Sequence, residues 1–112
     1  MRVRADFYVS ALVRWADGQL ISATVRHVGD PERGLLLITQ TNADHQVHIW
    51  VQQTSAEGQP CWHPRFEALL SETEADAFIA RERARDGDLW VIDVLGKDIG
   101  LPPVLPSCKG GV

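Results

Sequence analysis

Successive segments in the first half of the sequence alternate apolar and polar residues or form short apolar runs, and turn residues separate them. A period of two is the spacing at which a pleated strand directs side chains to opposite faces of a sheet. Turns are indicated at 16–18 (ADG) and 29–34 (GDPERG), because Gly, Pro and Asp favour turn geometry. The pattern predicts antiparallel strands joined as two hairpins, over residues 6–15, 19–28, 35–40 and 45–53.

The second half begins with a polar segment over 54–64, predicted as a loop with a short strand at 61–63 as the alternative. Ser71 and Glu74 then match a capping box, in which each side chain bonds the backbone N–H of the other residue. A helix is therefore predicted from Ser71 to about Arg85. Residues 89–95 are apolar on both faces except at Asp93, which is typical of an interior strand.

These elements predict one α+β domain over residues 1–100. The domain has a mostly antiparallel sheet of about five strands, with one main helix packed on one face. A chain of 112 residues suits a single domain. Residues 101–112 are rich in Pro and Gly and are predicted to be a disordered tail.

Composition narrows the classes of partner. The formal net charge of -4 gives the chain no overall cationic field, which disfavours nucleic acid and anionic membranes as partners. No apolar run is long enough to span a membrane, and the N-terminal residues do not read as a signal peptide. We therefore expect a cytoplasmic protein whose two cysteines, Cys61 and Cys108, are free thiols.

Motifs for the common chemistries are absent. The sequence contains no phosphate-binding glycine loop and no G-x-S-x-G elbow, and its Cys and His spacings do not match those of structural zinc sites. No cofactor and no metal ion is predicted.

Three alternative sites use residues with suitable chemistry. Cys61, His63 and Arg65 could form a small enzyme or ligand-binding loop. A stacking platform for single-stranded nucleic acid could use Tyr8, Arg14, Arg26 and Trp50. A ligand site at the end of the helix could use Arg81, Arg85 and Asp88.

The leading hypothesis rests on one face of the predicted sheet. In the expected register, the numbers of two residues that pair across the strands add up to 34 in the first hairpin and to 85 in the second. Large apolar residues then lie together on the face of the sheet away from the helix. These residues are Leu12, Leu20, Leu35, Leu37 and Trp50, with Tyr8, Arg14, Arg26 and His48 as a polar rim. Burying each large apolar side chain is worth about 1.5 to 3 kcal/mol, so something should cover them.

Two kinds of cover are expected for this face. The segment around Trp62 and Phe66 could fold back as a lid, or a second copy or an unknown protein partner could dock there. The sequence thus favours a small non-catalytic cytoplasmic interaction protein, in the form of a homodimer or a complex with another protein.

Two blocks of sequence resemble a known family. RADFYVSALVRW near the start and EADAFIARERARDGDLWVIDV near the end resemble small uncharacterised bacterial proteins, mostly alphaproteobacterial, that are classed as a domain of unknown function. The likeness covers residues 2–95 and rests mainly on Asp6 with the residues that follow it and on the block 80–91, which is the more specific of the two. The sequence departs from it at Cys61 to His63 and in the tail. The resemblance implies no activity, cofactor or site.

Overall fold

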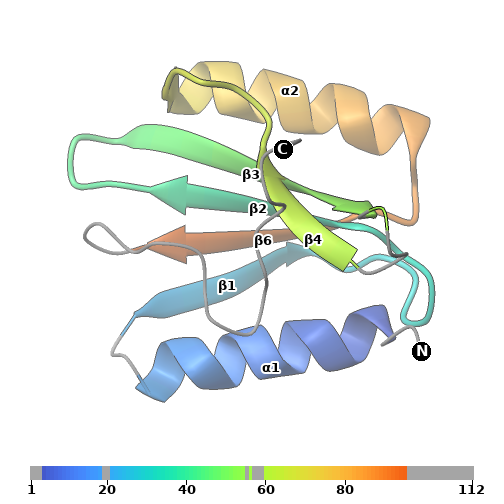
Figure 1. Ribbon diagram of the computed structural model, residues 1–112. Coiled ribbons are helices and arrows are strands. Elements are labelled where there is room, and N and C mark those ends of the chain that lie inside the picture. Colours follow the sequence, from blue (N-terminus) through green and yellow to red (C-terminus); the bar gives the residue numbers. More distant parts are fainter. Residues whose placement is uncertain (1–3, 19–20, 55, 57–59, 96–112) are drawn as a thin grey trace.

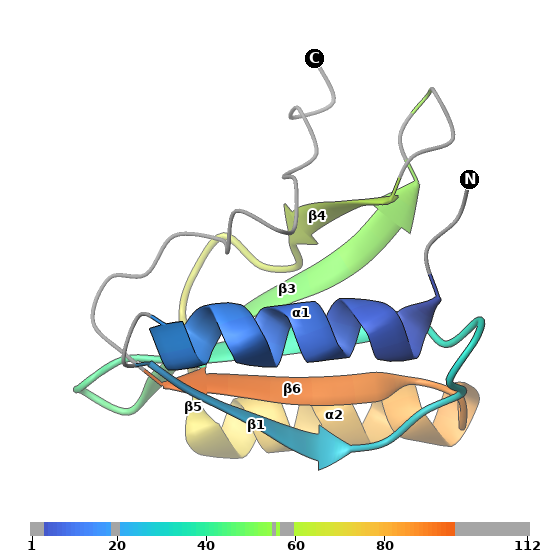
Figure 2. The same cartoon turned by 90° about the horizontal axis from the view of Figure 1, so that it is seen from below.

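A β-sheet lies between two helices in the structure, a computed structural model that describes residues 4–18, 21–54, 56 and 60–95 (Figures 1 and 2). The elements are α1 (Ala5–Gly18), β1 (Ser22–His27), β2 (Leu36–Thr41), β3 (Gln46–Thr54), β4 (Pro60–Pro64), β5 (Leu70–Ser71), α2 (Glu72–Arg85) and β6 (Trp90–Leu95). The predicted α+β class is confirmed. The predicted tail, 101–112, lies outside the described residues.

Strand β6 is an interior strand of the sheet and lies between β1 and β2. The strand order is β1-β6-β2-β3-β4, and β5 pairs with β3. All strand pairs are antiparallel except β2 with β6, which is parallel. Val91 and Ile92 of β6 are fully buried, which confirms that 89–95 is an interior strand.

Residues 6–15 form most of α1 and not the predicted strand, so that prediction is wrong. The segment is apolar nearly throughout and therefore fits a period of two as well as a helical period. The buried residues Ala5, Val9, Leu12 and Ala16 follow helical spacing. The run also exceeds the usual length of a strand, which favours a helix. As a consequence the predicted first hairpin does not exist, and β1 pairs with β6 instead.

The second predicted hairpin, β2 with β3, forms in a different register. Leu37 lies opposite Val51, and Thr41 lies opposite Val47. The turn lies over 42–45 and not over 41–44. The Asn42 side-chain carbonyl holds it there by accepting hydrogen bonds from the backbone N–H groups of Asp44 and Gln46. A shift by an odd number of residues reverses the faces of a strand. Trp50 and Leu37 therefore lie on opposite faces of the sheet.

Each face of the sheet has its own core, and each core is covered by a helix (Figure 1). On one face α1 packs on a cluster that includes Leu36, Ile38, Trp62, Trp90, Ile92 and Val94. On the other face Ala75, Phe78 and Ile79 of α2 pack on Leu37, Val47, Ile49, Leu89 and Val91. The side of the sheet away from α2, where a lid or a partner was expected, is covered by α1.

The sequence predicted α2 closely. The capping box is present. Ser71 Oγ accepts a hydrogen bond of 3.1 Å from the Glu74 backbone N–H, and Glu74 Oε1 accepts one of 2.9 Å from the Ser71 backbone N–H.

None of the described helices is long and apolar enough to cross a membrane.

Candidate functional site

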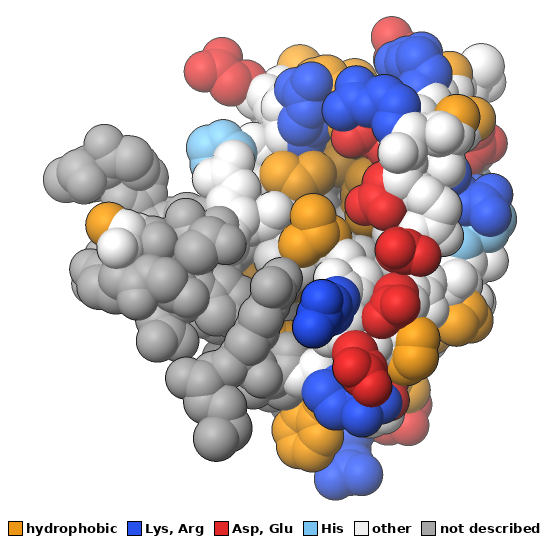
Figure 3. Space-filling view, turned by 90° about the vertical axis from the view of Figure 1, so that its right-hand side faces the viewer, with side chains coloured by type: hydrophobic (Ala, Val, Ile, Leu, Met, Phe, Trp, Pro, Cys, Tyr) orange, Lys and Arg blue, Asp and Glu red, His pale blue; other side chains and the backbone are white. Residues whose placement is uncertain are grey.

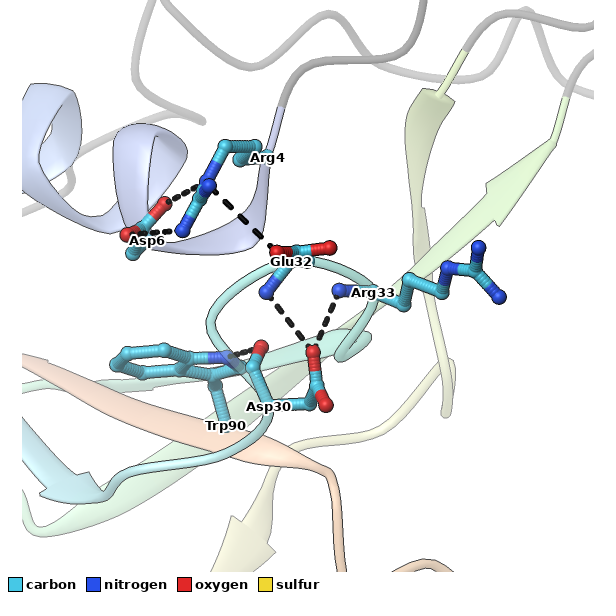
Figure 4. A network of polar contacts seen from close by, with 6 residues as sticks. All are labelled: Arg4, Asp6, Asp30, Glu32, Arg33 and Trp90. Atoms are coloured by element: carbon cyan, nitrogen blue, oxygen red, sulfur yellow. Dashed lines mark hydrogen bonds and ion pairs between the residues drawn. The ribbon is translucent and has the colours of Figure 1, made fainter.

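The turn at 29–34 is fixed to the start of β6 by a polar network (Figure 4). Trp90 Nε1 donates a hydrogen bond of 2.8 Å to the Asp30 carbonyl oxygen. The Asp30 backbone N–H donates one of 3.0 Å to the Asp88 carbonyl oxygen. Asp30 Oδ1 accepts the backbone N–H groups of Glu32 and Arg33, and these bonds lower the pKa of its carboxyl group. The network ends next to Leu35, which the turn holds at the surface.

Asp6, in the first block of the family resemblance, joins this network through Arg4. The Arg4 guanidinium lies 3.2 Å from the Asp6 carboxylate and 3.7 Å from that of Glu32 (Figure 4). Both blocks of the resemblance thus contact the 29–34 turn.

Two adjoining hollows open at the C-terminal end of α2, with volumes of about 420 and 430 Å³. Arg65, Glu82 and Arg85 line both hollows, so we treat them as one feature, the arginine groove. Its apolar lining consists of Leu35, Leu36, Leu37, Val51, Phe66, Phe78, Ala84 and Leu89. Figure 3 shows this end of the molecule, where hydrophobic side chains lie beneath a group of basic ones.

Arg65 is held in place by aromatic rings. Its backbone N–H donates to the Ile49 carbonyl oxygen at 2.8 Å. The guanidinium carbon lies 4.7 Å from the centroid of the Phe66 ring and 5.4 Å from that of Phe78. The two rings meet edge to face, with centroids 5.1 Å apart. A cation over an aromatic face is attracted by the ring quadrupole, so Arg65 is positioned without a carboxylate.

The acidic side chains of the groove already have partners. Glu82 pairs with Arg85 at 3.6 Å, and the Asp86 carboxylate accepts the backbone N–H of Asp88 at 3.0 Å. Within the described part of the chain, Arg65 and Arg81 take part in no ion pair. The groove therefore offers guanidinium groups that can bind an anionic group.

A second, polar pocket of about 290 Å³ lies near the start of α2. Asp93 Oδ1 accepts hydrogen bonds from the hydroxyl groups of Thr39 at 2.7 Å and Thr41 at 3.2 Å. Arg26 pairs with Asp76 at 3.5 Å across the pocket. No buried side-chain polar atom of the described residues lacks a hydrogen bond, and no group of them could hold a metal ion. These pairings describe a closed structural network.

The residues predicted to share one sheet face are separated in the structure. Tyr8, Leu12 and Trp50 pack on the α1 side, while Leu37 is buried on the α2 side. Arg26 also lies on the α2 side, since it pairs with Asp76 of α2. Arg14 and Leu35 are exposed, and Leu20 lies outside the described residues. The predicted common face, and with it the platform of Tyr8, Arg14, Arg26 and Trp50 for nucleic acid, does not form.

His48 stacks on Trp50, with ring centroids 4.4 Å apart. Burial lowers the pKa of His48 and raises the pKa of the Tyr8 hydroxyl, because each charged form is disfavoured away from water. Both residues are half-buried and support the core on the α1 side.

The Cys61, His63 and Arg65 loop is mostly strand β4. Cys61 is buried and disulfide-bonded, so the prediction that it is a free thiol is wrong and no thiolate nucleophile is available there. His63 is half-buried opposite Val51. Arg65 of this set lines the arginine groove, together with Arg81 and Arg85.

The sequence had thus indicated parts of the arginine groove in two separate places, the 61–65 loop and the end of the helix. It did not indicate Phe66 and Phe78 as a support for Arg65. The i, i+4 spacing of Arg81 and Arg85 places them on one face of α2, which was a readable signal. That Arg65 lies beside them depends on the pairing of β4 with β3.

A model of the DUF1491 family, described as a protein of unknown function, matches residues 3–100. The chain belongs to the DUF1491 family. The match confirms the resemblance to an uncharacterised alphaproteobacterial family. Among curated proteins, none matches this DUF1491 chain.

Solved structures similar to this DUF1491 chain come from two bacteria. A crystal structure of a DUF1491 family protein from Caulobacter crescentus CB15 is 24% identical, with a TM-score of 0.83 over 94% of this chain and 98% of that one. The solution structure of protein Atu0922 from A. tumefaciens is also 24% identical, with a TM-score of 0.80 over 96% and 97%. An NMR structure of a DUF1491 family protein from C. crescentus is 26% identical, with a TM-score of 0.76 over 88% and 89%. These likenesses establish the fold.

Proposed function

We propose that this protein is a small non-catalytic interaction module and that it binds a segment of another protein in the arginine groove. The observation that supports this proposal is the groove itself, where apolar side chains remain open to solvent between charged ones. Leu35 is 41% exposed although the adjacent Leu36 and Leu37 are buried. Interfaces commonly combine an apolar centre with a rim rich in Arg.

The self-association predicted from a bare sheet face loses its basis, because α1 covers that face. We therefore propose a different protein as the partner. A cytoplasmic location remains part of the proposal, although the disulfide bond at Cys61 weighs against a reducing compartment.

Selection of peptides from a random display library on the immobilised protein tests this function. We expect the selected peptides to bind the wild type and to lose at least about tenfold in affinity to a Leu35→Asp variant, since the charge disrupts the apolar centre. Leu95→Asp is the matched control, because Leu95 is similarly exposed, at 46%, and does not line the groove. If both variants bind like the wild type, or if no peptide is selected, the proposed function is wrong.

A further inference from the structure

The arginine groove carries positive charge on a chain that is acidic overall. Its arginines come from two elements, Arg65 from the end of β4 and Arg81 and Arg85 from the last turns of α2. Of these, only Arg85 has a carboxylate partner among the described residues, Glu82 at 3.6 Å. The formal charge of the whole chain is -4, so this local excess is not a property of the general surface.

The Arg65 side chain is preorganised to bind an anion. The guanidinium carbon lies over the Phe66 and Phe78 rings, and among the described residues no carboxylate pairs with the guanidinium group. The guanidinium fork matches the two oxygens of a carboxylate, and a side chain already held in place loses less conformational entropy on binding.

The lining of the groove distinguishes between kinds of anion. A nucleic acid binds mainly through its phosphates, which contact basic side chains and gain nothing from an apolar lining. Leu35, Val51 and Leu89 provide an apolar surface that a phosphate group cannot use. A peptide can fill both parts, with an apolar side chain on the leucines and carboxylates on the arginines.

From this complementarity we infer that the groove recognises an acidic, extended segment of a partner protein, in which Asp or Glu residues flank an apolar side chain. The inference rests on the proposed function and specifies the chemistry of the partner. Arg65 lines both hollows and, unlike Arg85, has no carboxylate partner among the described residues, so it is the arginine that we test.

Fluorescence anisotropy with three labelled peptides tests the inference. All three carry the same central Leu, flanked by Asp and Glu in the first, by Asn and Gln in the second and by Lys in the third. We expect the acidic peptide to bind roughly tenfold tighter than the neutral one, because hydrogen bonds to charged groups are the stronger ones. This advantage should fall as salt is added, since the groups are partly exposed.

Arg65→Gln should remove most of the preference for the acidic peptide over the neutral one. Arg65→Lys should restore the preference only in part, because Lys keeps the charge but lacks the planar fork. Arg14→Gln is the control, since Arg14 is an exposed arginine of α1 outside the groove. Circular dichroism verifies that each variant is folded.

The inference and the proposed function fail in different ways. If library-selected peptides depend on Leu35 but contain no excess of Asp and Glu, and the three test peptides bind equally, the acidic partner is excluded and the interaction module stands. If an oligonucleotide binds more tightly than the acidic peptide and loses binding in Arg65→Gln, the partner is a nucleic acid and the inference is wrong. If no peptide shows binding that depends on Leu35, both are wrong.

Discussion

Asp93 is a single acidic residue in an interior strand of the sheet, and its neighbours explain how it is tolerated. In the paired strands it lies opposite Thr24 on β1 and Thr39 on β2. The side chain of Thr39 is almost fully buried, at 1% exposure, and donates to the carboxylate of Asp93. The sequence identified Asp93 as an exception in an apolar run, but it could not identify the hydroxyl groups that satisfy it, because they come from a strand more than fifty residues away.

An Asp93→Ala variant should lower the free energy of unfolding by about 1 to 3 kcal/mol, because it leaves the buried Thr39 hydroxyl without its main acceptor. Asp93→Asn keeps an oxygen at the same place and should cost clearly less. Urea denaturation of the two variants measures the difference. Equal losses for both would mean that the negative charge, and not the hydrogen bonds from Thr39 and Thr41, is what matters.

Gly34 is a residue for which the 29–34 turn leaves no room for a side chain. A Cβ atom there would overlap the carbonyl oxygen of Asp88 and would lie 2.8 Å from the Asp30 carbonyl oxygen and from Cδ1 of Trp90. Gly34→Ala should therefore destabilise the protein by about 1 to 3 kcal/mol through overpacking. Gly87→Ala is the control, since a Cβ at Gly87 meets no atom within 4 Å. Thermal unfolding should show a loss at Gly34 that the control does not share.

At the scale of elements, α1 shows where local pattern fails as a guide. Residues 6–15 fit both a strand and a helix because polar residues are too few to mark one period. By contrast α2 has a capping box, acidic residues in its first turn and basic residues in its last turn, so local chemistry alone determines its bounds. The helix whose ends carry polar signals was predicted, and the helix whose sequence is nearly uniform was not.

The role of α1 as the cover of one sheet face can be tested at Leu12, which is fully buried. Leu12→Ala should cost about 2 to 5 kcal/mol of stability, as large-to-small changes in a core do. Ser10→Ala, on the exposed side of the same helix, should leave stability nearly unchanged. Chemical denaturation compares the two variants. If Leu12→Ala is as stable as the control, α1 does not pack on the sheet as described.

At the scale of the whole molecule, the order in which the strands pair differs from the order that the sequence predicts. The parallel pairing of β2 with β6 joins segments that are separated by β3, β4, β5 and α2, and no local pattern encodes it. With β6 between β1 and β2, both faces of the sheet are apolar and each is covered by a helix. Helix α1 covers the side on which a partner was expected. The arginine groove has the same origin, since it forms where the end of β4 meets the end of α2.

The position of β6 between β1 and β2 also determines which backbone hydrogen bonds of the sheet open first. Its neighbours β1 and β2 protect both edges, and α1 and α2 protect both faces, so its amides should exchange with solvent only through global unfolding. Strand β1 pairs with β6 alone among the described residues, and its residues alternate between exposed and half-buried. The β1 amides that point away from β6 should therefore exchange much faster, which NMR after transfer to D₂O measures directly. If those amides are protected like β6, and more so as the protein concentration rises, then a second copy covers this edge, because an open strand edge is a ready template for another chain.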